Sequence, residues 1–203
     1  MPYNCFVQIQ GNAVMTIQTP KPKLALSQRI AKPSDVPAII SLMQESIAEN
    51  MKAYLSSQEI EAAKETMGVD STLIKDGSYF LIEAEIQAEA VLVGCGGWGK
   101  RKTLFGGDHT LGRDDSLSDP TTDAARIRAM YTHPGFTRQG IGSLLLRLGE
   151  DAARVAGFKR IQLGSTLAGE PLYRAAGYME LKRENIKGAN GSDSYIITME
   201  KPL

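Results

Sequence analysis

The segment AARIRAMYTHPGFTRQGIG, residues 124–142, constrains the fold more than any other part of the chain. It reads as a strand, a His-Pro-Gly turn and a Gly-x-Gly pair that opens an amphipathic helix. The first N–H groups of a helix have no partner inside the helix, and the helix dipole places partial positive charge there. Gly140 and Gly142 leave room for a phosphate group, and Arg138 adds a fixed positive charge. The segment predicts an α/β protein that binds a nucleotide-like phosphate carrier, although glycines also simply end strands and permit turns.

The next segments follow in a recognisable order. An apolar stripe continues at helical spacing after the glycines, and Gly157 ends it. A strand is expected over residues 159–164 (KRIQLG) and a short helix over 167–178 (LAGEPLYRAAGY). Together, the glycine loop and the segment Leu172–Tyr178 resemble the GNAT (Gcn5-related N-acetyltransferase) superfamily, whose members carry a Leu/Phe-Tyr-x-x-x-Gly-Phe/Tyr segment after such a loop. The resemblance covers roughly residues 28–201 and is strong from Ile127 to Tyr178.

This resemblance implies a fold and an activity. The fold would be α/β and three-layered, with a mixed, mostly antiparallel sheet of seven strands and helices on both faces. The activity would be transfer of an acetyl or other acyl group from acetyl-CoA to a primary amine of a small molecule or peptide, by direct attack in a ternary complex. No metal is implied, and the acceptor cannot be read from the sequence.

The resemblance also assigns the cofactor contacts. The backbone of Met130, Tyr131 and Thr132 would pair with the thioester carbonyl and the pantetheine amides of acetyl-CoA. The pyrophosphate would lie on the loop and helix start formed by Arg138, Gln139, Gly140, Ile141, Gly142 and Ser143. The family favours Arg or Gln three residues before the first glycine, where this chain has Thr137. It often has Asn where this chain has Thr166, which leaves a contact from Thr166 to the pantetheine arm in doubt.

The strand before the loop permits two patterns. If Ile127 and Met130 both point inward, the strand has a β-bulge near Arg128 and Ala129. If Ile127, Ala129 and Tyr131 share one face, no bulge is needed. GNAT proteins have a bulge here, and their strand diverges from the next one.

Tyr173 is the candidate general acid. A phenol within hydrogen-bond reach can protonate the CoA thiolate as it leaves, and the matching tyrosine often does so in the family. The alternative is a tyrosine that packs its ring and bonds a backbone carbonyl. The general base is not identified: the candidates by residue type are Glu83, Glu85, His109 and His133, and a water chain would serve equally well.

Composition limits the function classes. A chain of 203 residues is expected to form one domain, and a net charge of zero supplies no basic stripe for nucleic acid. No apolar run is long enough to span a membrane, and no secretory signal is visible. The two cysteines, Cys5 and Cys95, suggest neither a disulfide framework nor a metal site, and Cys95 is expected to be a buried small hydrophobe. We therefore expect a cytoplasmic protein.

The chain divides into an N-terminal extension, residues 1–26, and an acyltransferase domain, residues 27–203. The extension could form a hairpin around Gly11-Asn12, or a tail disordered outside a homodimer, followed by a Pro-rich linker. In the domain, Ser34 is expected to cap a helix, and a second helix should run over 57–67. Strands are expected over 28–31, 79–85, 90–98, 179–184 and 194–200. The aperiodic residues 99–123 would be either a functional loop beside the acceptor or plain disorder.

Two other functions remain open at this point. A GNAT-fold module could sense acyl-CoA without turnover, although Tyr173 argues for catalysis. A Rossmann dinucleotide fold is disfavoured because Leu145 stands where its third glycine would be. Trp98 could line the acceptor pocket or pack in the core.

Overall fold

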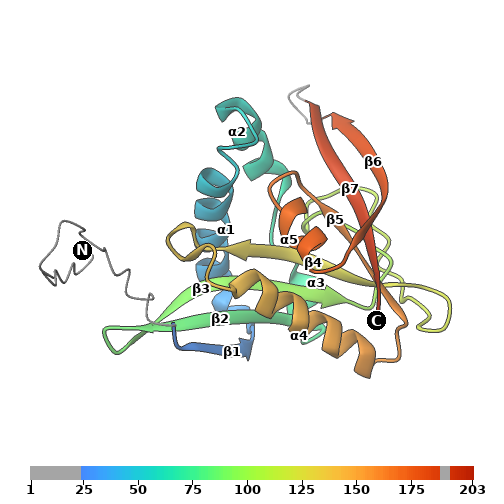
Figure 1. The fold of residues 1–203 in the computed structure, drawn as a ribbon, viewed down its shortest axis with the longest axis horizontal. Helices are drawn as coiled ribbons and strands as arrows, with labels where there is room; N and C mark the ends of the chain where they lie inside the picture. The colour runs from blue at the N-terminus through green and yellow to red at the C-terminus, as the bar shows by residue number, and fades with distance from the viewer. Residues whose placement is uncertain (1–23, 188–192) are drawn as a thin grey trace, which may run out of the picture.

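The computed structural model describes residues 24–187 and 193–203, so the predicted N-terminal hairpin or tail lies outside the described residues. Seven strands form one sheet in the order β1-β2-β3-β4-β5-β7-β6 (Figure 1). Every neighbouring pair is antiparallel except β4 and β5, which are parallel. The predicted mixed, mostly antiparallel sheet is confirmed.

The strands agree with the sequence pattern to within a few residues. They are β1 (Leu26–Ile30), β2 (Tyr79–Ile86), β3 (Glu89–Gly99), β4 (Ala125–Thr132), β5 (Arg160–Ser165), β6 (Met179–Lys187) and β7 (Asp193–Pro202). Gln87 and Ala88 join β2 to β3 as a two-residue turn with φ angles of 52° and 66°. Positive φ at both central positions is what such a hairpin turn requires.

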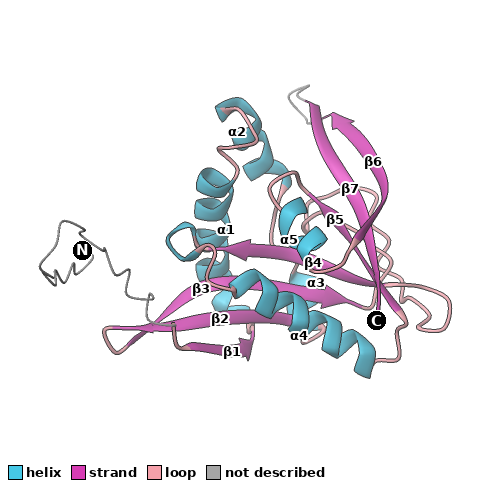
Figure 2. Ribbon diagram, viewed as in Figure 1, coloured by secondary structure: helices cyan, strands magenta, loops and turns pink. Residues whose placement is uncertain are grey.

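The helices cover both faces of the sheet (Figure 2). They are α1 (Val36–Asn50), α2 (Ser57–Thr66), α3 (Ser71–Lys75), α4 (Ile141–Val155) and α5 (Glu170–Ala175). Buried side chains of α1, α2 and α3 pack with β2 and β3 in one core cluster, which includes Ile39, Ile47, Ile60, Leu73, Leu81 and Cys95. Side chains of α4 and α5 pack on the other face with β4, β5 and β7, including Leu146, Ala153, Tyr173, Ile127, Leu163 and Ile197. The three-layer arrangement follows from these two cores.

One helix start differs from the prediction. Ser34 does not cap α1: it lies in a 3-10 turn, Pro33–Asp35, and Asp35 is the N-cap residue. The Asp35 carboxylate instead accepts hydrogen bonds from the Lys32 N–H at 2.7 Å and from the Arg29 guanidinium at 2.8 Å. The start of α2 has the expected capping chemistry, with Ser56 and Glu59 bonding each other's backbone N–H.

The short helix α3 was not expected from the sequence. It is too short for its periodicity to be visible, and it begins where Asp70 accepts a hydrogen bond from the Thr72 N–H at 3.2 Å. Leu73 and Ile74 are its only buried residues, so little apolar pattern marks it. At the other end of the chain, α5 is shorter than the helix predicted over 167–178.

The long connection between β3 and β4 is folded against the sheet. Arg128 of β4, 5% exposed, donates to Asp70 Oδ2 at 2.7 Å and to the carbonyls of Thr103 at 2.8 Å and Gly106 at 2.6 Å. Arg113 donates to the other oxygen of Asp70 at 3.0 Å. One buried carboxylate therefore joins β4, α3 and the connection, and plain disorder of this segment is not observed.

Candidate active site

The predicted bulge in β4 is present. Gly97 pairs with Arg128 and Cys95 pairs with Tyr131, so two residues of β4 lie opposite the single residue between them on β3. The two residues are Ala129 and Met130, and Ala129 has a φ of 50°. This is a bulge of the type that redirects backbone groups near functional sites, and the alternative of an unbroken strand is wrong.

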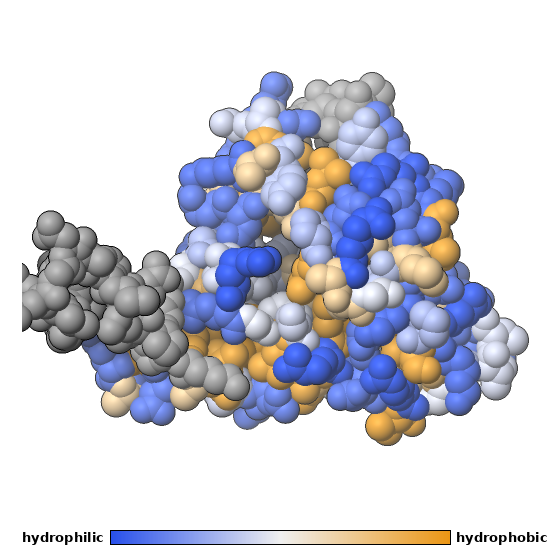
Figure 3. Space-filling model, in the orientation of Figure 1, coloured by the Kyte–Doolittle hydropathy of each residue, from blue (hydrophilic) through white to orange (hydrophobic). Residues whose placement is uncertain are grey.

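Beyond the bulge, β4 and β5 separate. They pair only at Ala125 with Ile161 and at Arg126 with Gln162. Figure 1 shows the two strands diverging from that point, and Figure 3 shows a hollow in the same region of the surface, between the α1–α2 side and the β6–β7 side. The edge of β4 that faces this gap has no strand partner after Arg126 in residues 24–187 and 193–203.

Strand alternation determines which backbone groups face the gap. The N–H of His133 donates to Val93 on β3 at 2.9 Å, and Tyr131 also pairs with β3. Because backbone groups of successive residues point to opposite edges, those of Met130 and Thr132 point toward the gap. The Thr132 carbonyl already accepts one hydrogen bond, since Asn50 at the end of α1 donates to it at 2.8 Å. Nothing in the sequence indicates this contact.

The glycine loop opens α4 with unsatisfied donors. Gly140 is the N-cap residue, in the left-handed conformation with a φ of 84°, and no side chain caps the helix. The first intrahelical bond runs from the Leu144 N–H to the Gly140 carbonyl at 2.9 Å. The N–H groups of Ile141, Gly142 and Ser143 therefore have no partner within the helix, which is the arrangement that binds anions.

The two glycines of the loop have different roles. A Cβ at Gly140 would meet nothing within 4 Å, so this position borders open space. A Cβ at Gly142 would lie 2.8 Å from Leu172 Cδ2, so its missing side chain makes room for α5. The expectation that both glycines leave space for a phosphate is corrected: only Gly140 does, and Gly142 can contribute its N–H group.

Packing, and no described ion pair, holds the loop in place. Arg138 is exposed, has a φ of 61°, and forms no ion pair with any residue the structure describes. Its neighbour Gln139 is also exposed. Ile141, 1% exposed, anchors the helix start by packing onto β3 at Gly94, where a side chain would collide with it.

Tyr173 lies on α5 facing the core. It is 8% exposed, and burial raises the pKa of its phenol to about 12. Its ring packs edge-on against Tyr178 with centroids 5.9 Å apart, and its hydroxyl forms no hydrogen bond to any described residue. The Tyr173 side chain belongs to the same core cluster as Ile127 of β4 and Leu163 of β5, and it therefore lies against the strands that separate.

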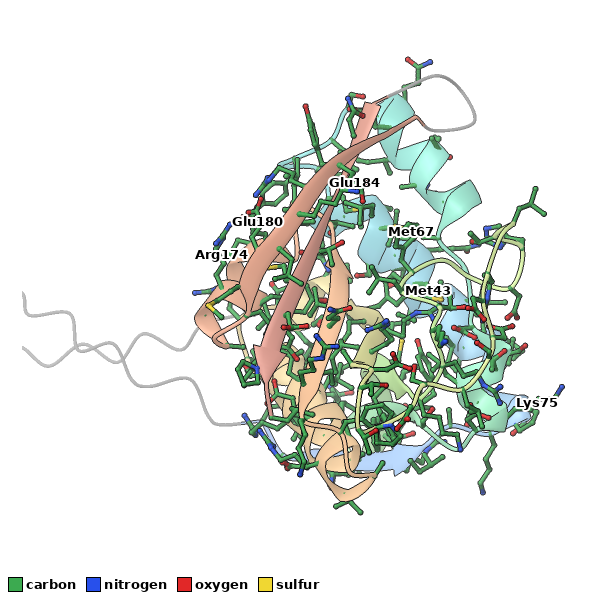
Figure 4. The ribbon with its side chains drawn as sticks, turned by 90° about the vertical axis from the view of Figure 1, so that its right-hand side faces the viewer. Met43, Met67, Lys75, Arg174, Glu180 and Glu184 are labelled. Atoms are coloured by element: carbon green, nitrogen blue, oxygen red, sulfur yellow. The ribbon has the colours of Figure 1, made fainter. Side chains whose placement is uncertain are left out.

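Ion pairs hold α5 against β6. Arg174 donates to Glu170 of its own helix at 2.8 Å and to Glu180 of β6 at 2.6 Å, and Arg183 of β6 donates back to Glu170 at 2.8 Å. Figure 4 shows Arg174 and Glu180 next to each other at the outer side of β6, whereas Met43 and Met67 lie on the side of α1 and α2. Hydrogen bonds from Arg174 lower the pKa of Glu170, and those from Arg183 lower the pKa of Glu180. The helix that carries Tyr173 thus has a fixed place on the sheet.

The other predicted positions have identifiable partners. Thr166 accepts a hydrogen bond from the Gly169 N–H at 3.3 Å, and Thr137 donates to the Pro134 carbonyl at 3.4 Å. Both threonines therefore stabilise turns.

The candidate bases do not converge on one position. Glu83 pairs with Arg29 of β1 at 2.9 Å. His133 is a turn residue: its Nδ1 accepts from the Gly135 N–H at 3.1 Å and its Nε2 lies 3.3 Å from Glu45. His109 packs against Gly68, at the contact between the β3–β4 connection and the α2–α3 connection.

Two further residues belong to the core. Trp98 packs edge-on against Phe158 with ring centroids 6.2 Å apart, which supports its core interpretation. Cys95 is fully buried, and burial raises the pKa of its thiol to about 12. A thiol with this pKa is no nucleophile at neutral pH.

A cavity of about 280 Å³ lies between α4 and α5. Ser143 and Arg147 line it from α4, Leu172 from α5 and Lys201 from β7. Its floor includes the buried Glu150, which accepts hydrogen bonds from Lys201 at 2.9 Å and from the Tyr178 hydroxyl at 3.1 Å. Within the described residues, no three side chains are grouped to hold a metal ion, and no helix is both long and apolar enough to cross a bilayer.

Comparisons with known proteins agree with this geometry. The chain is similar in structure to a GCN5-related N-acetyltransferase from Rhodopseudomonas palustris, with a TM-score of 0.62 and 20% identity over 92% of this chain and 99% of that one. It is also similar to PaiA N-acetyltransferase from Thermoplasma acidophilum in complex with coenzyme A. The TM-score is 0.56 and the identity 16%, over 88% of this chain and 99% of that one. A third similar structure is the putative acetyltransferase yncA from Salmonella typhimurium with its cofactor acetyl-CoA. The TM-score is 0.55 and the identity 18%, over 88% of this chain and 94% of that one.

These identities show a shared fold and no more. No curated protein sequence matches the chain. The sequence model of the acetyltransferase (GNAT) family, however, matches residues 41–178, which include most of α1, the bulged strand, the glycine loop and Tyr173. The chain belongs to the GNAT acetyltransferase family.

Proposed function

We propose that this protein is an acetyl-CoA-dependent N-acetyltransferase that acetylates a primary amine. The observation that carries the proposal is the gap between β4 and β5. Free backbone groups of Met130 lie on one side of it, the uncapped start of α4 lies at one end, and Tyr173 packs in the core cluster that side chains of both strands form. Structures that share the fold hold coenzyme A or acetyl-CoA.

The cofactor would occupy this gap along its length. The N–H groups of Ile141, Gly142 and Ser143 suit the pyrophosphate, together with the cation of Arg138, which forms no ion pair within residues 24–187 and 193–203. The polar groups of Met130 and the N–H of Thr132 suit the thioester and the pantetheine amides. The Thr132 carbonyl already accepts one hydrogen bond from Asn50, which leaves one of its two lone pairs for the cofactor.

The reaction needs positioning more than activation, because a thioester is already reactive. The amine nitrogen attacks the thioester carbonyl carbon, a C–N bond forms, and the C–S bond then breaks. Tyr173 gives its proton to the departing CoA thiolate, and the amine loses its proton to a basic side chain or to water. A hydroxyl without a structural hydrogen bond is free for this transfer, which favours catalysis over a sensing module.

The first experiment is ligand binding measured by thermal unfolding. A ligand at about 100 times its Kd adds about 2.7 kcal/mol of stability, which corresponds to a rise of about 5–10 °C for a chain of this size. We expect such a rise with millimolar acetyl-CoA and with CoA. No change at these concentrations would refute cofactor binding.

The second experiment is CoA thiol release across a panel of amines, from polyamines to peptides with a free N-terminus. Turnover with any of them supports the enzyme. Tight binding of acetyl-CoA with no amine-dependent thiol release in the panel would favour a sensing module.

A further inference from the structure

The peptide between Ala129 and Met130 is unusual in lacking strand partners. Neither residue is paired with β3, because the register passes from Arg128 to Tyr131 opposite the step from Gly97 to Cys95. Neither is paired with β5, whose ladder with β4 ends at Arg126. The φ of 50° at Ala129 is unfavourable for a residue with a Cβ, so other contacts must hold this peptide in place.

The contact that holds it comes from Tyr79, the first residue of β2. The Tyr79 hydroxyl donates to the Ala129 carbonyl at 2.9 Å, and the whole side chain is 1% exposed. Burial raises the pKa of this phenol well above its usual range, so it stays a donor at every physiological pH. Its oxygen also lies 3.3 Å from Cys95 Sγ. Because the carbonyl can only accept, the single hydroxyl proton goes to Ala129.

A glycine of β3 makes room for Tyr79. A Cβ at Gly97 would lie 2.8 Å from Tyr79 Cδ2 and 2.7 Å from the Ser78 carbonyl. The neighbouring Gly96 faces the other side of the sheet, where a Cβ would lie 3.0 Å from Met130 Sδ. Gly97 therefore admits the Tyr79 ring, and Gly96 admits the Met130 side chain of the bulge.

Peptide planarity links this contact to the gap. The carbonyl of Ala129 and the N–H of Met130 belong to one trans peptide and point in opposite directions. With the carbonyl directed to Tyr79, the N–H of Met130 is directed away from Tyr79. Strand alternation gives the same result. Tyr131 pairs with β3, so the backbone N–H of Met130 points to the opposite edge of β4, where pairing with β5 has ended.

We infer that Tyr79 is a positioning residue for catalysis: its hydroxyl fixes the Ala129–Met130 peptide so that the Met130 N–H is presented to the acyl carbonyl. This inference rests on the proposed function. During attack, negative charge develops on the carbonyl oxygen, and a donor already aimed at it stabilises the transition state more than the ground state. Tyr79 itself touches no substrate and acts only through the peptide.

The test is Tyr79→Phe, which removes one hydroxyl and keeps the ring. Loss of one donor of this type lowers kcat by about 10²–10³-fold. In Tyr79→Phe the Met130 N–H is still present, but the Ala129–Met130 peptide is held less firmly. We therefore expect a smaller fall in kcat, of about 10–100-fold, with the KM for acetyl-CoA within about twofold of wild type.

A spectroscopic measurement separates positioning from general damage. Acetyl-CoA labelled with ¹³C at the thioester carbonyl, bound to the wild type, should show a lower carbonyl stretching frequency than in apolar solvent, because a hydrogen bond weakens the C=O bond. In Tyr79→Phe this frequency should move back upward. The matched control is Tyr178→Phe, which also removes a buried hydroxyl bond, to Glu150, and should change neither kcat nor the frequency.

The outcomes are distinct. A wild type that binds no acetyl-CoA refutes the proposed function and this inference with it. A wild type that turns over, with Tyr79→Phe unchanged in kcat or in carbonyl frequency, refutes the inference alone, as does a rise in KM at constant kcat. If Tyr79→Phe does not fold, it is remade with Ala129→Gly, because glycine adopts the positive φ without strain and restores stability. The comparison is then with Ala129→Gly alone.

Discussion

Replacing Arg128 with Met should destabilise the protein strongly. The change keeps an unbranched apolar stem and removes the guanidinium that donates to Asp70, Thr103 and Gly106. Asp70 would remain almost fully buried, with 1% of its side chain exposed, and would keep Arg113 as its charged partner. The two loop carbonyls would lose their donors.

The expected loss follows from these contacts. Removing one partner of a buried ion pair reduces the free energy of unfolding by about 3–5 kcal/mol, because a buried charge is left under-compensated. Arg113 still neutralises part of the Asp70 charge, which makes the loss smaller. Each carbonyl left without a donor makes the loss larger by about 1 kcal/mol. These two effects oppose each other, so the expected loss stays at about 3–5 kcal/mol. A domain of this size should then unfold about 6–20 °C lower.

The assay is urea unfolding followed by circular dichroism, with a thermal scan on the same samples. The matched control is Arg160→Met, which also removes a donor to a loop carbonyl, that of Thr122 at 2.6 Å, but from a side chain 47% exposed. We expect a loss of at most about 1 kcal/mol for the control. A loss below about 1 kcal/mol for Arg128→Met would refute the view that the Asp70 cluster holds the β3–β4 connection.

Three further predictions concern the proposed site. Tyr173→Phe should lower kcat by about 10²-fold at neutral pH and leave the KM for acetyl-CoA and the stability nearly unchanged; full turnover on a verified amine would make Tyr173 structural. Because a phenol with its pKa raised to about 12 stays protonated below that pH, the acid should act throughout the neutral and mildly basic range. A fall in kcat centred near pH 9 that is absent in Tyr173→Phe would contradict this assignment. Gly142→Val should reduce stability by about 1–3 kcal/mol through collision with Leu172, with partial recovery on adding Leu172→Ala; weaker CoA binding at unchanged stability would instead mean that the new side chain blocks the anion site.

The sequence was sufficient where function depends on the backbone of a continuous segment. The strand, turn and glycines of residues 124–142 lie together because they are adjacent in the chain, so their pattern predicted the free N–H groups at the helix start. The pattern only permitted the bulge, which the family resemblance implied. The antiparallel pairing of β2 with β3 and of β6 with β7 could also be predicted, because short connections join these strands.

Contacts between distant residues could not be predicted in this way. Asn50 reaches Thr132 across 82 positions, and Tyr79 reaches Ala129 across 50. Asp70 is an ordinary helix cap when taken with Thr72, and only the fold shows that its other oxygen holds Arg128. The sequence also does not show what a side chain at a glycine position would meet. That Gly142 makes room for Leu172 of α5 could therefore be seen only in the structure.

The separation of β4 from β5 divides the sheet into two halves, here called panels, that are joined by a short β-ladder. One panel comprises β1 to β4, the other β5, β7 and β6, and only two residue pairs join them directly. A molecule that hydrogen-bonds along the open edge of β4 takes the place of the strand pairing that the protein gives up there. Its binding should therefore slow amide hydrogen exchange in both panels together, because the ligand joins them where the polypeptide does not.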